Sequence, residues 1–136
     1  QKAMLPLMHA ATRLNQENGR RLNIFATPWS PPAWMKVPVN GVQAMDGSAK
    51  PAGLIETEMA TWANYISEFI SAYKAHGIDL WGITVQNEPE YAAPWEACVY
   101  SPDYERQFIV EHLGPLLRAK HPGLKILAYD HNKNDL

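Results

Sequence analysis

A strand that stops at a carboxylate followed by a proline constrains the fold of this chain more than any other feature. Residues 83–89 read Ile-Thr-Val-Gln-Asn-Glu-Pro. Proline has no backbone N–H to give to a sheet, so a central strand should end there. The residue before a proline is disfavoured in helical geometry, so Glu88 is expected to be extended. Glu88 is therefore predicted to end a strand with Asn87 beside it, which is where α/β barrels carry their catalytic side chains.

Apolar periodicity along the rest of the chain predicts an alternation of helices and strands. A first helix is expected over 6–15, and a longer helix should be capped by Thr57 and stopped by Gly77. A third helix should start at Ser101, because Pro102 and two acidic residues occupy its first turn, and Gly114-Pro115 should kink it. The longer helix has one apolar stripe, made of Met59, Trp62, Ile66, Phe69, Ile70 and Tyr73. Strands are predicted over 22–27, 78–86 and 125–129.

This alternation predicts a parallel sheet with crossover helices. Polar or aromatic side chains follow each strand, and there is no Gly-rich phosphate loop, so a barrel mouth is favoured over the crevice of an open sheet. A closed eight-stranded barrel needs about 250 residues. The 136 residues with three strands are therefore expected to form the central part of one α/β (TIM) barrel domain, with two sheet edges unpaired.

The composition excludes several classes of protein and leaves others open. The net charge of −2 gives no indication of nucleic acid as a partner. No apolar run approaches the roughly 18 residues that span a bilayer. The N-terminus lacks both an initiator Met and the pattern of a signal peptide, so the chain is expected to be an excerpt. The single Cys98 is expected to be a small buried residue.

The long segment 28–53 contains two tryptophans and several prolines near its start. Loops of this length in compact domains are usually functional or disordered. We expect the first part to be shaped and packed. The second part, 41–53, is polar and contains glycines, and we expect it to be mobile.

Two motifs resemble loops of glycoside hydrolase family 30. Residues 26–36 read Ala-Thr-Pro-Trp-Ser-Pro-Pro-Ala-Trp-Met-Lys and resemble the loop after that family's third strand. Residues 84–91 read Thr-Val-Gln-Asn-Glu-Pro-Glu-Tyr and resemble its fourth-strand motif. The segments 95–98, 105–109, 112–116 and 130–132 follow the pattern of the glucosylceramidase group.

The resemblance implies strands 3 to 5 of a (β/α)₈ barrel and retaining hydrolysis of β-glycosides without a metal or organic cofactor. It implies that Glu88 is the general acid/base, that Asn87 binds the sugar hydroxyl next to the anomeric carbon, and that Trp29 lines the subsite of the non-reducing sugar. Asp130 would lie on the pocket wall. The nucleophile would be a glutamate on a later strand outside this chain, so the rest of the barrel would be required. A secreted or lysosome-like location is implied, although the sequence leaves the compartment open.

Structural interpretations of the same residues remain open. Glu88 could be a strand-end glutamate bonded to the next loop, and Asn87 could be a turn residue. Trp29 and Trp34 could plug the barrel end, and we favour a sugar role for Trp29 and a structural role for Trp34. Tyr91 and Trp95 are candidates for the aglycone side.

Other polar residues are weaker candidates for chemistry. Glu90 follows Glu88 too closely to be the second carboxylate and is expected to form an ion pair in the loop. His131 has no second His or Cys at ligand spacing, so no metal site is expected. The remaining histidines are expected to be structural or solvated.

The functional prediction is a glucosylceramidase-like retaining β-glycosidase. In a retaining enzyme one carboxyl group must stay protonated near working pH, and Glu88 suits that role because apolar and aromatic residues flank it. The alternatives are an endo-β-1,6-glucanase or xylan hydrolase of the same family, a non-catalytic carbohydrate-binding fragment, and a structural fragment with no independent fold.

Overall fold

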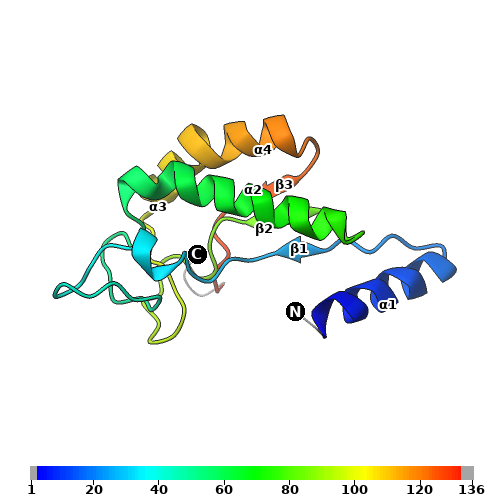
Figure 1. The fold of residues 1–136 in the computed structure, drawn as a ribbon, viewed down its shortest axis with the longest axis horizontal. Coiled ribbons are helices and arrows are strands. Elements are labelled where there is room, and N and C mark those ends of the chain that lie inside the picture. Colours follow the sequence, from blue (N-terminus) through cyan, green and yellow to red (C-terminus); the bar gives the residue numbers. More distant parts are fainter. Residues whose placement is uncertain (1–2, 133–136) are drawn as a thin grey trace.

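The fold is a three-stranded parallel sheet covered by helices on one side. The computed structural model describes residues 3–132, and the strands β1 (Phe25–Ala26), β2 (Gly82–Thr84) and β3 (Lys125–Leu127) lie in the order β1-β2-β3 (Figure 1). Both strand pairs are parallel, with Ile83 opposite Ala26 on one side and Ile126 on the other. The helical elements are α1 (Met4–Glu17), η1 (Ala33–Met35), η2 (Glu56–Glu58), α2 (Met59–Ala75), α3 (Pro102–Gln107), η3 (Phe108–Leu113) and α4 (Gly114–Lys120).

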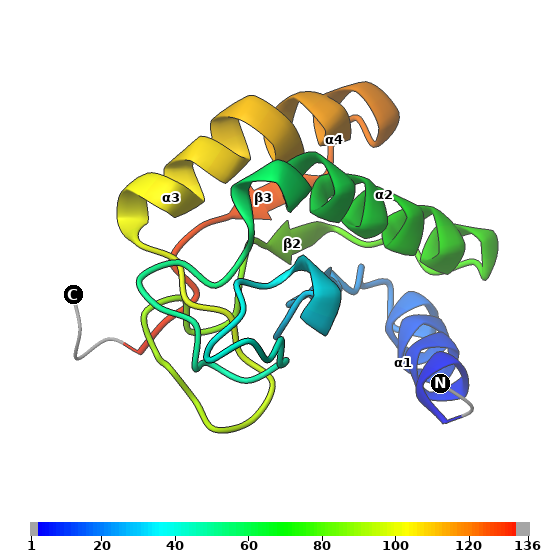
Figure 2. The same cartoon turned by 60° about the vertical axis from the view of Figure 1, so that its left-hand side comes forward.

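Two helical crossovers join the strands and form the core with the sheet. The helix α2 connects β1 to β2, while α3, η3 and α4 connect β2 to β3, and both crossovers lie on the same side of the sheet (Figures 1 and 2). The predicted stripe of α2 is confirmed, because Met59, Trp62, Ile66 and Ile70 are buried. From the other crossover, Phe108, Leu113 and Leu117 pack into the same cluster. The predicted fold class, part of a parallel α/β barrel, is thus confirmed.

The strands are shorter than the apolar runs predicted. The runs 22–27, 78–86 and 125–129 contain only two or three strand residues each. Pairing continues beyond them as separate hydrogen bonds, such as Val85 N–H to Leu127 O at 3.1 Å. Within residues 3–132 only β2 has a strand on each side, so β1 and β3 each leave one edge without a paired strand, as predicted.

Two helix boundaries differ from the prediction. Thr57 does not cap α2, because it lies within the 3₁₀ turn η2 and the helix starts at Met59 without a side-chain cap. The irregularity expected at Gly114-Pro115 takes the form of the π-helical segment η3, in which the Gly114 N–H bonds to Ile109 O five residues back. Pro115 has no N–H to continue an α-helical ladder. A Cβ on Gly114 would lie 2.7 Å from Ile109 O, so this close approach requires glycine.

The first helix is longer than predicted and has no buried residue. Its apolar side chains Leu7 and Leu14 are 69% and 56% exposed. The side chain of Tyr73, at the end of α2, contacts Met4, with its hydroxyl 3.8 Å from Sδ. Within residues 3–132, the apolar face of α1 is therefore mostly open.

The long loop between β1 and α2 is partly packed, and buried residues occur in the half that was expected to be mobile. Gly47, Ala49 and Gly53 are buried. The Gly47 N–H bonds to Ala93 O at 2.8 Å, and the Gly53 N–H bonds to Val99 O at 2.7 Å. These bonds hold the loop against the loop after β2, and the two loops lie together beyond the carboxyl ends of the strands in both views (Figures 1 and 2).

A buried lysine lies between these two loops. Lys36 is 1% exposed, and its ammonium group donates to the carbonyl oxygens of Asp46 and Ala97. Burial lowers the pKa of Lys36. The neighbouring Cys98 is fully buried, as predicted, and burial raises the pKa of its thiol to about 12. Lys36 therefore joins the two loops by bonding backbone groups of both.

Candidate functional site

The carboxyl ends of the three strands are joined by backbone hydrogen bonds. The Asn87 N–H donates to Pro28 O at 2.9 Å, and the Glu88 N–H donates to Asp130 O at 2.8 Å. Asn87 also forms a parallel bridge with Asp130. Three segments that are more than 40 residues apart in the chain thus meet at one end of the sheet, at Pro28, at Asn87 with Glu88, and at Asp130.

Glu88 does not have the extended backbone predicted for it. Its φ is +44°, in the left-handed region, which costs a non-glycine residue about 1–3 kcal/mol. Pro89 disfavours the right-handed helical region but leaves this conformation open. The turn is stabilised on both sides, since the Tyr91 N–H bonds to Glu88 O at 3.0 Å and the Tyr100 N–H bonds to Pro89 O at 2.7 Å. The backbone thus turns at Glu88 instead of ending as a straight strand.

The carboxyl group of Glu88 is half-buried and has an amide partner. The side chain of Asn132 donates from Nδ2 to Glu88 Oε1 at 3.1 Å. The sequence analysis grouped Asn132 with the end of the third strand but did not assign it to the site. Its position two residues after Asp130 is the signal that pointed to it.

Gln86 is a second site residue that the sequence analysis did not select. It is fully buried, and its Nε2 donates to Trp29 O at 2.8 Å and to Asn87 O at 2.9 Å. The amide therefore bonds the backbone of two candidate residues on neighbouring strand ends. A polar side chain inside a buried strand is the sequence signal for such a role.

Four aromatic side chains surround this end of the sheet and are all largely exposed. Trp29, Trp34, Tyr91 and Trp95 are 51%, 56%, 46% and 47% exposed. Within residues 3–132 the ring of Trp34 does not fill the sheet end, and its structural role stays a prediction. Tyr91 and Trp95 contact each other edge to face, with ring centroids 6.0 Å apart. The exposed rings provide flat apolar faces, which suit the C–H groups of a pyranose.

The polar residues around Glu88 include one buried carboxyl group. Glu90 is exposed and forms no ion pair within the described part of the chain, so the expected ion pair is not present there. Glu105 is 6% exposed, and its pKa is raised, mainly by burial and further by the charge of Glu90, while a hydrogen bond from the Tyr129 N–H opposes the rise. Residues 3–132 hold no cluster of three or more His, Cys, Asp or Glu that is placed to bind a metal.

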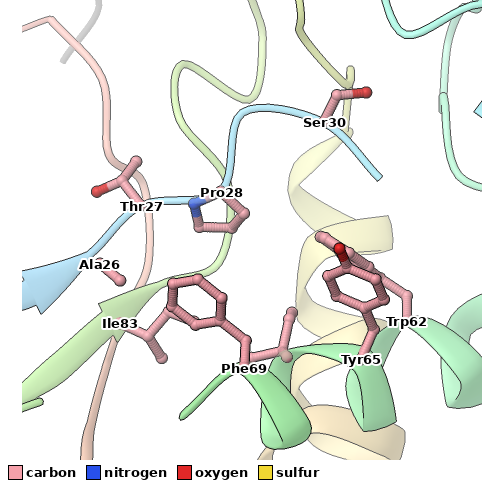
Figure 3. Close-up of a pocket in the computed structure, with 9 residues that line it drawn as sticks. Ala26, Thr27, Pro28, Ser30, Trp62, Tyr65, Phe69 and Ile83 are labelled. Carbon is pink, nitrogen blue, oxygen red and sulfur yellow. The ribbon is translucent and has the colours of Figure 1, made fainter. Parts of the chain in front are cut away.

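Two cavities flank the sheet on its opposite faces. One, of about 260 Å³, extends from Phe25 past Thr84 to Asp130. The other, of about 200 Å³, lies between α2 and the end of β1. Figure 3 shows Trp62, Tyr65 and Phe69 of α2 facing Ala26, Thr27 and Pro28 across it. None of the candidate site residues lines the second cavity, so it belongs to helix packing and not to the site.

Comparisons with known proteins agree with the fold and with the resemblance of the loops. The model of the glycosyl hydrolase family 30 TIM-barrel domain matches residues 1–136. The chain is similar to the lysosomal acid glucosylceramidase of Mus musculus, with 33% identity over 95% of this chain and 25% of that protein. It is also similar to an endo-1,6-β-D-glucanase of Trichoderma harzianum, with 34% identity over 90% of this chain and 26% of the other.

A solved structure supports the same assignment. A solved structure of an endo-β-1,6-glucanase superposes with a TM-score of 0.82 at 29% identity, over 96% of this chain and 28% of that chain. The chain thus spans about a quarter of the length of the relatives it matches. No helix within residues 3–132 combines the length and apolar character needed to cross a membrane.

Proposed function

Because this chain belongs to glycosyl hydrolase family 30, we propose that it carries the acid/base half of a retaining β-glycosidase with a glucosylceramidase-like substrate. The observation that carries the proposal is the joining of Glu88, Asn87, Trp29 and Asp130 at the carboxyl ends of parallel strands, through bonds such as Glu88 N–H to Asp130 O. Conserved function at this end of the strands is the rule in barrel enzymes.

In the proposed reaction Glu88 acts twice. It first gives its proton to the oxygen of the leaving group, and it then takes a proton from the water that attacks a glycosyl-enzyme intermediate. The nucleophile would be a second carboxylate, about 5–5.5 Å away in retaining enzymes. We propose that this group comes from a strand outside residues 1–136, so the rest of the barrel is required for turnover.

The neighbouring side chains would bind the sugar. We propose that Asn87 bonds the hydroxyl next to the anomeric carbon, that Trp29 stacks on the non-reducing sugar, and that Asp130 lies on the pocket wall. Tyr91 and Trp95 would contact the aglycone. Their exposure at the sheet end and their contact with each other support this assignment.

The main test is the removal of the Glu88 carboxyl group from the protein that contains residues 1–136. With a 2,4-dinitrophenyl β-glucoside, which leaves without a proton, Glu88→Ala should keep glycosylation but turn over slowly in water. Azide should restore turnover and yield a β-glycosyl azide, because azide attacks the intermediate without a general base. An unchanged rate without azide, and no azide product, would remove Glu88 from this role.

The second candidate substrate is a β-1,6-linked glucan. It is favoured by the similarity to two endo-β-1,6-glucanases, one of which has a solved structure. Rates on glucosylceramide in detergent micelles and on a β-1,6-glucan separate the two candidates. A preference for the glucan would assign the aromatic pair to a glucose unit of the chain instead of a lipid. Hydrolysis of xylan would indicate the remaining alternative, a xylan hydrolase of the same family.

A non-catalytic role makes a different prediction. A carbohydrate-binding remnant would bind a β-glucoside without cleaving it, and Trp29→Ala would weaken that binding. Circular dichroism of residues 1–136 tests the remaining alternative, a segment with no independent fold. A cooperative melt would rule that alternative out.

A further inference from the structure

We propose that Asn132 is a positioning residue for Glu88, whose Oε1 it holds as a hydrogen-bond acceptor, so that Oε2 is the oxygen that carries the catalytic proton. This inference rests on the acid/base role proposed for Glu88. Asn132 lies after the end of β3 and belongs to neither of the two loop motifs that resemble the family.

The first step is the contact between the amide and the carboxyl group. Nδ2 of Asn132 lies 3.1 Å from Oε1 of Glu88, which is within the usual range of N–H···O hydrogen bonds. An ionised carboxylate has only acceptor atoms, so the amide must present its NH₂ group to it and not its oxygen. The chemistry of the two groups therefore makes Asn132 the donor.

The second step is the consequence for the proton of the acid. In a protonated carboxyl group one oxygen carries the hydrogen and donates, whereas the other is a carbonyl-type acceptor. An N–H group that already lies on Oε1 favours the form in which Oε1 is that acceptor. The proton then lies on Oε2. Glu88 thus offers one defined oxygen to the substrate instead of two interchangeable ones.

The third step is the fixed position of the amide, which matters because Asn132 is exposed and water competes for its donor. The Glu88 N–H bonds to Asp130 O at 2.8 Å. The His131 N–H bonds to Tyr129 O at 3.0 Å, and the Asn132 N–H bonds to His131 Nδ1 at 2.9 Å. The rings of Tyr129 and His131 stack, with centroids 5.6 Å apart. The turn after β3 is thus bonded both internally and to the backbone of Glu88, which keeps the amide beside the carboxyl group.

Both half-reactions of the proposed mechanism use Oε2. In the first, the proton leaves Oε2 for the glycosidic oxygen as the bond from that oxygen to the anomeric carbon breaks, and the carboxylate of the nucleophile bonds the same carbon. In the second, water attacks that carbon, the bond to the nucleophile breaks, and a proton of the water goes to Oε2. Asn132 keeps its bond to Oε1 throughout.

The test compares variants of Asn132 on two substrates in the protein that contains residues 1–136. Asn132→Leu has a similar size but no donor, and Asn132→Asp has the same shape but only acceptors when ionised. Asn132→Gln keeps the donor on a longer side chain. Phenyl β-glucoside needs a proton from the acid/base and 2,4-dinitrophenyl β-glucoside does not. A misplaced Glu88 therefore slows the first substrate selectively, whereas a loss of folded protein slows both equally.

We expect Asn132→Leu and Asn132→Asp to lower kcat/KM for the phenyl glucoside by about 10-fold, which is part of the roughly 10²–10⁴-fold that general acid–base catalysis supplies. The value for the dinitrophenyl glucoside should stay nearly unchanged. Asn132→Gln should retain most of the wild-type rate on both substrates. Asn64→Leu, which removes an exposed amide bonded within α2, is the matched control and should affect neither substrate.

A double variant tests whether Asn132 acts through Glu88. Adding Asn132→Leu to Glu88→Ala should lower the rate on the phenyl glucoside no further, because the carboxyl group that Asn132 holds is already gone. A further loss as large as that caused by Asn132→Leu alone would mean that Asn132 acts independently of Glu88, and it would overturn the inference.

Three other results would overturn the inference. These are equal losses on both substrates, no loss in Asn132→Leu and Asn132→Asp, or a loss in Asn132→Gln as large as that in Asn132→Leu. Glu88→Ala, measured beside them, separates this inference from the proposed function. If Glu88→Ala shows no dependence on the leaving group, the acid/base role fails and the inference fails with it. If only Glu88→Ala shows the dependence, the inference alone fails.

Discussion

The side-chain amide of Gln86 donates a 2.8 Å hydrogen bond to the backbone carbonyl of Trp29. A buried residue just after β2 thus fixes the start of the loop that follows the neighbouring strand β1. The same nitrogen bonds Asn87 O at 2.9 Å. The position of an exposed indole ring thus depends on an amide that no solvent reaches.

Gln86→Met should destabilise the protein and disturb the site together. The change keeps the volume of the side chain but leaves two carbonyl groups without their donor. We expect the free energy of unfolding to fall by about 1–3 kcal/mol, with a higher KM because Trp29 is displaced. Chemical denaturation and steady-state kinetics measure the two effects. Asn64→Ala, which removes an exposed amide bonded within α2, is the control. Equal stability of Gln86→Met and the wild type would contradict the role of Gln86.

Lys36→Met should loosen the two loops without unfolding the sheet. Its ammonium group bonds the carbonyl oxygens of Asp46 and Ala97, which belong to different loops. Removing it leaves both carbonyls unpaired and should increase amide exchange at Gly47 and Gly53, whose N–H groups bond across the loops. Hydrogen exchange followed by mass spectrometry measures the exchange rates of these two amides. Lys50→Met, in the same loop but exposed, should leave exchange unchanged.

Trp95→Ala should raise KM and leave stability nearly unchanged. The ring is 47% exposed, so its loss should alter the free energy of unfolding by no more than about 0.5 kcal/mol. If the pair with Tyr91 binds the aglycone, KM should rise for a substrate with a large aglycone and stay constant for methyl β-glucoside. A similar rise for both substrates would contradict the aglycone assignment. Val110→Ala, an exposed change on η3, is the control.

His121 should make the protein less stable as the pH falls through the range just below 6.5. Its Nε2 lies 2.9 Å from Ser67 Oγ and 3.1 Å from Ser67 O. Burial lowers the pKa of His121; the nearby Lys74 and Lys120 also lower it, while the Ser67 carbonyl and Glu68 oppose the change.

The sign follows from linkage. The unfolded chain binds a proton more readily than the folded one, so stability declines as the pH drops from about 6.5 towards the lower folded-state pKa and then levels off. His121→Gln should flatten this part of a plot of unfolding free energy against pH. His76→Gln, at the exposed end of α2, should leave the slope unchanged. A slope that persists in His121→Gln would contradict the assignment.

The sequence predicted the order of the elements well because apolar periodicity depends on local spacing. The stripe of α2 and the positions of the three strands follow from that spacing alone. Strand lengths were overestimated because ladder pairing depends on neighbours that periodicity does not contain. Thr57 was a plausible cap by residue type, yet the chain forms a 3₁₀ turn there.

The site was predicted in part for a similar reason. The motif around Glu88 could be placed at a strand end because proline stops a strand, and the backbone bonds join it to Pro28 and Asp130 as parallel pairing requires. Its left-handed backbone could not be predicted, since contacts from other segments stabilise it. Gln86 and Lys36 were missed because they bond backbone groups of distant segments, Trp29 O and Ala97 O respectively. The chemical roles of the site residues stay predictions until the variants are measured.

The outer borders of β1 and β3 present backbone donors and acceptors with no strand beside them within residues 3–132. Unpaired strand edges of this kind are templates for pairing with an extended segment of another chain. Residues 1–136 prepared alone should therefore self-associate as their concentration rises, and light scattering would detect it. In a longer chain, further strands of the barrel would pair with these two edges. The barrel would then extend from both sides of this segment.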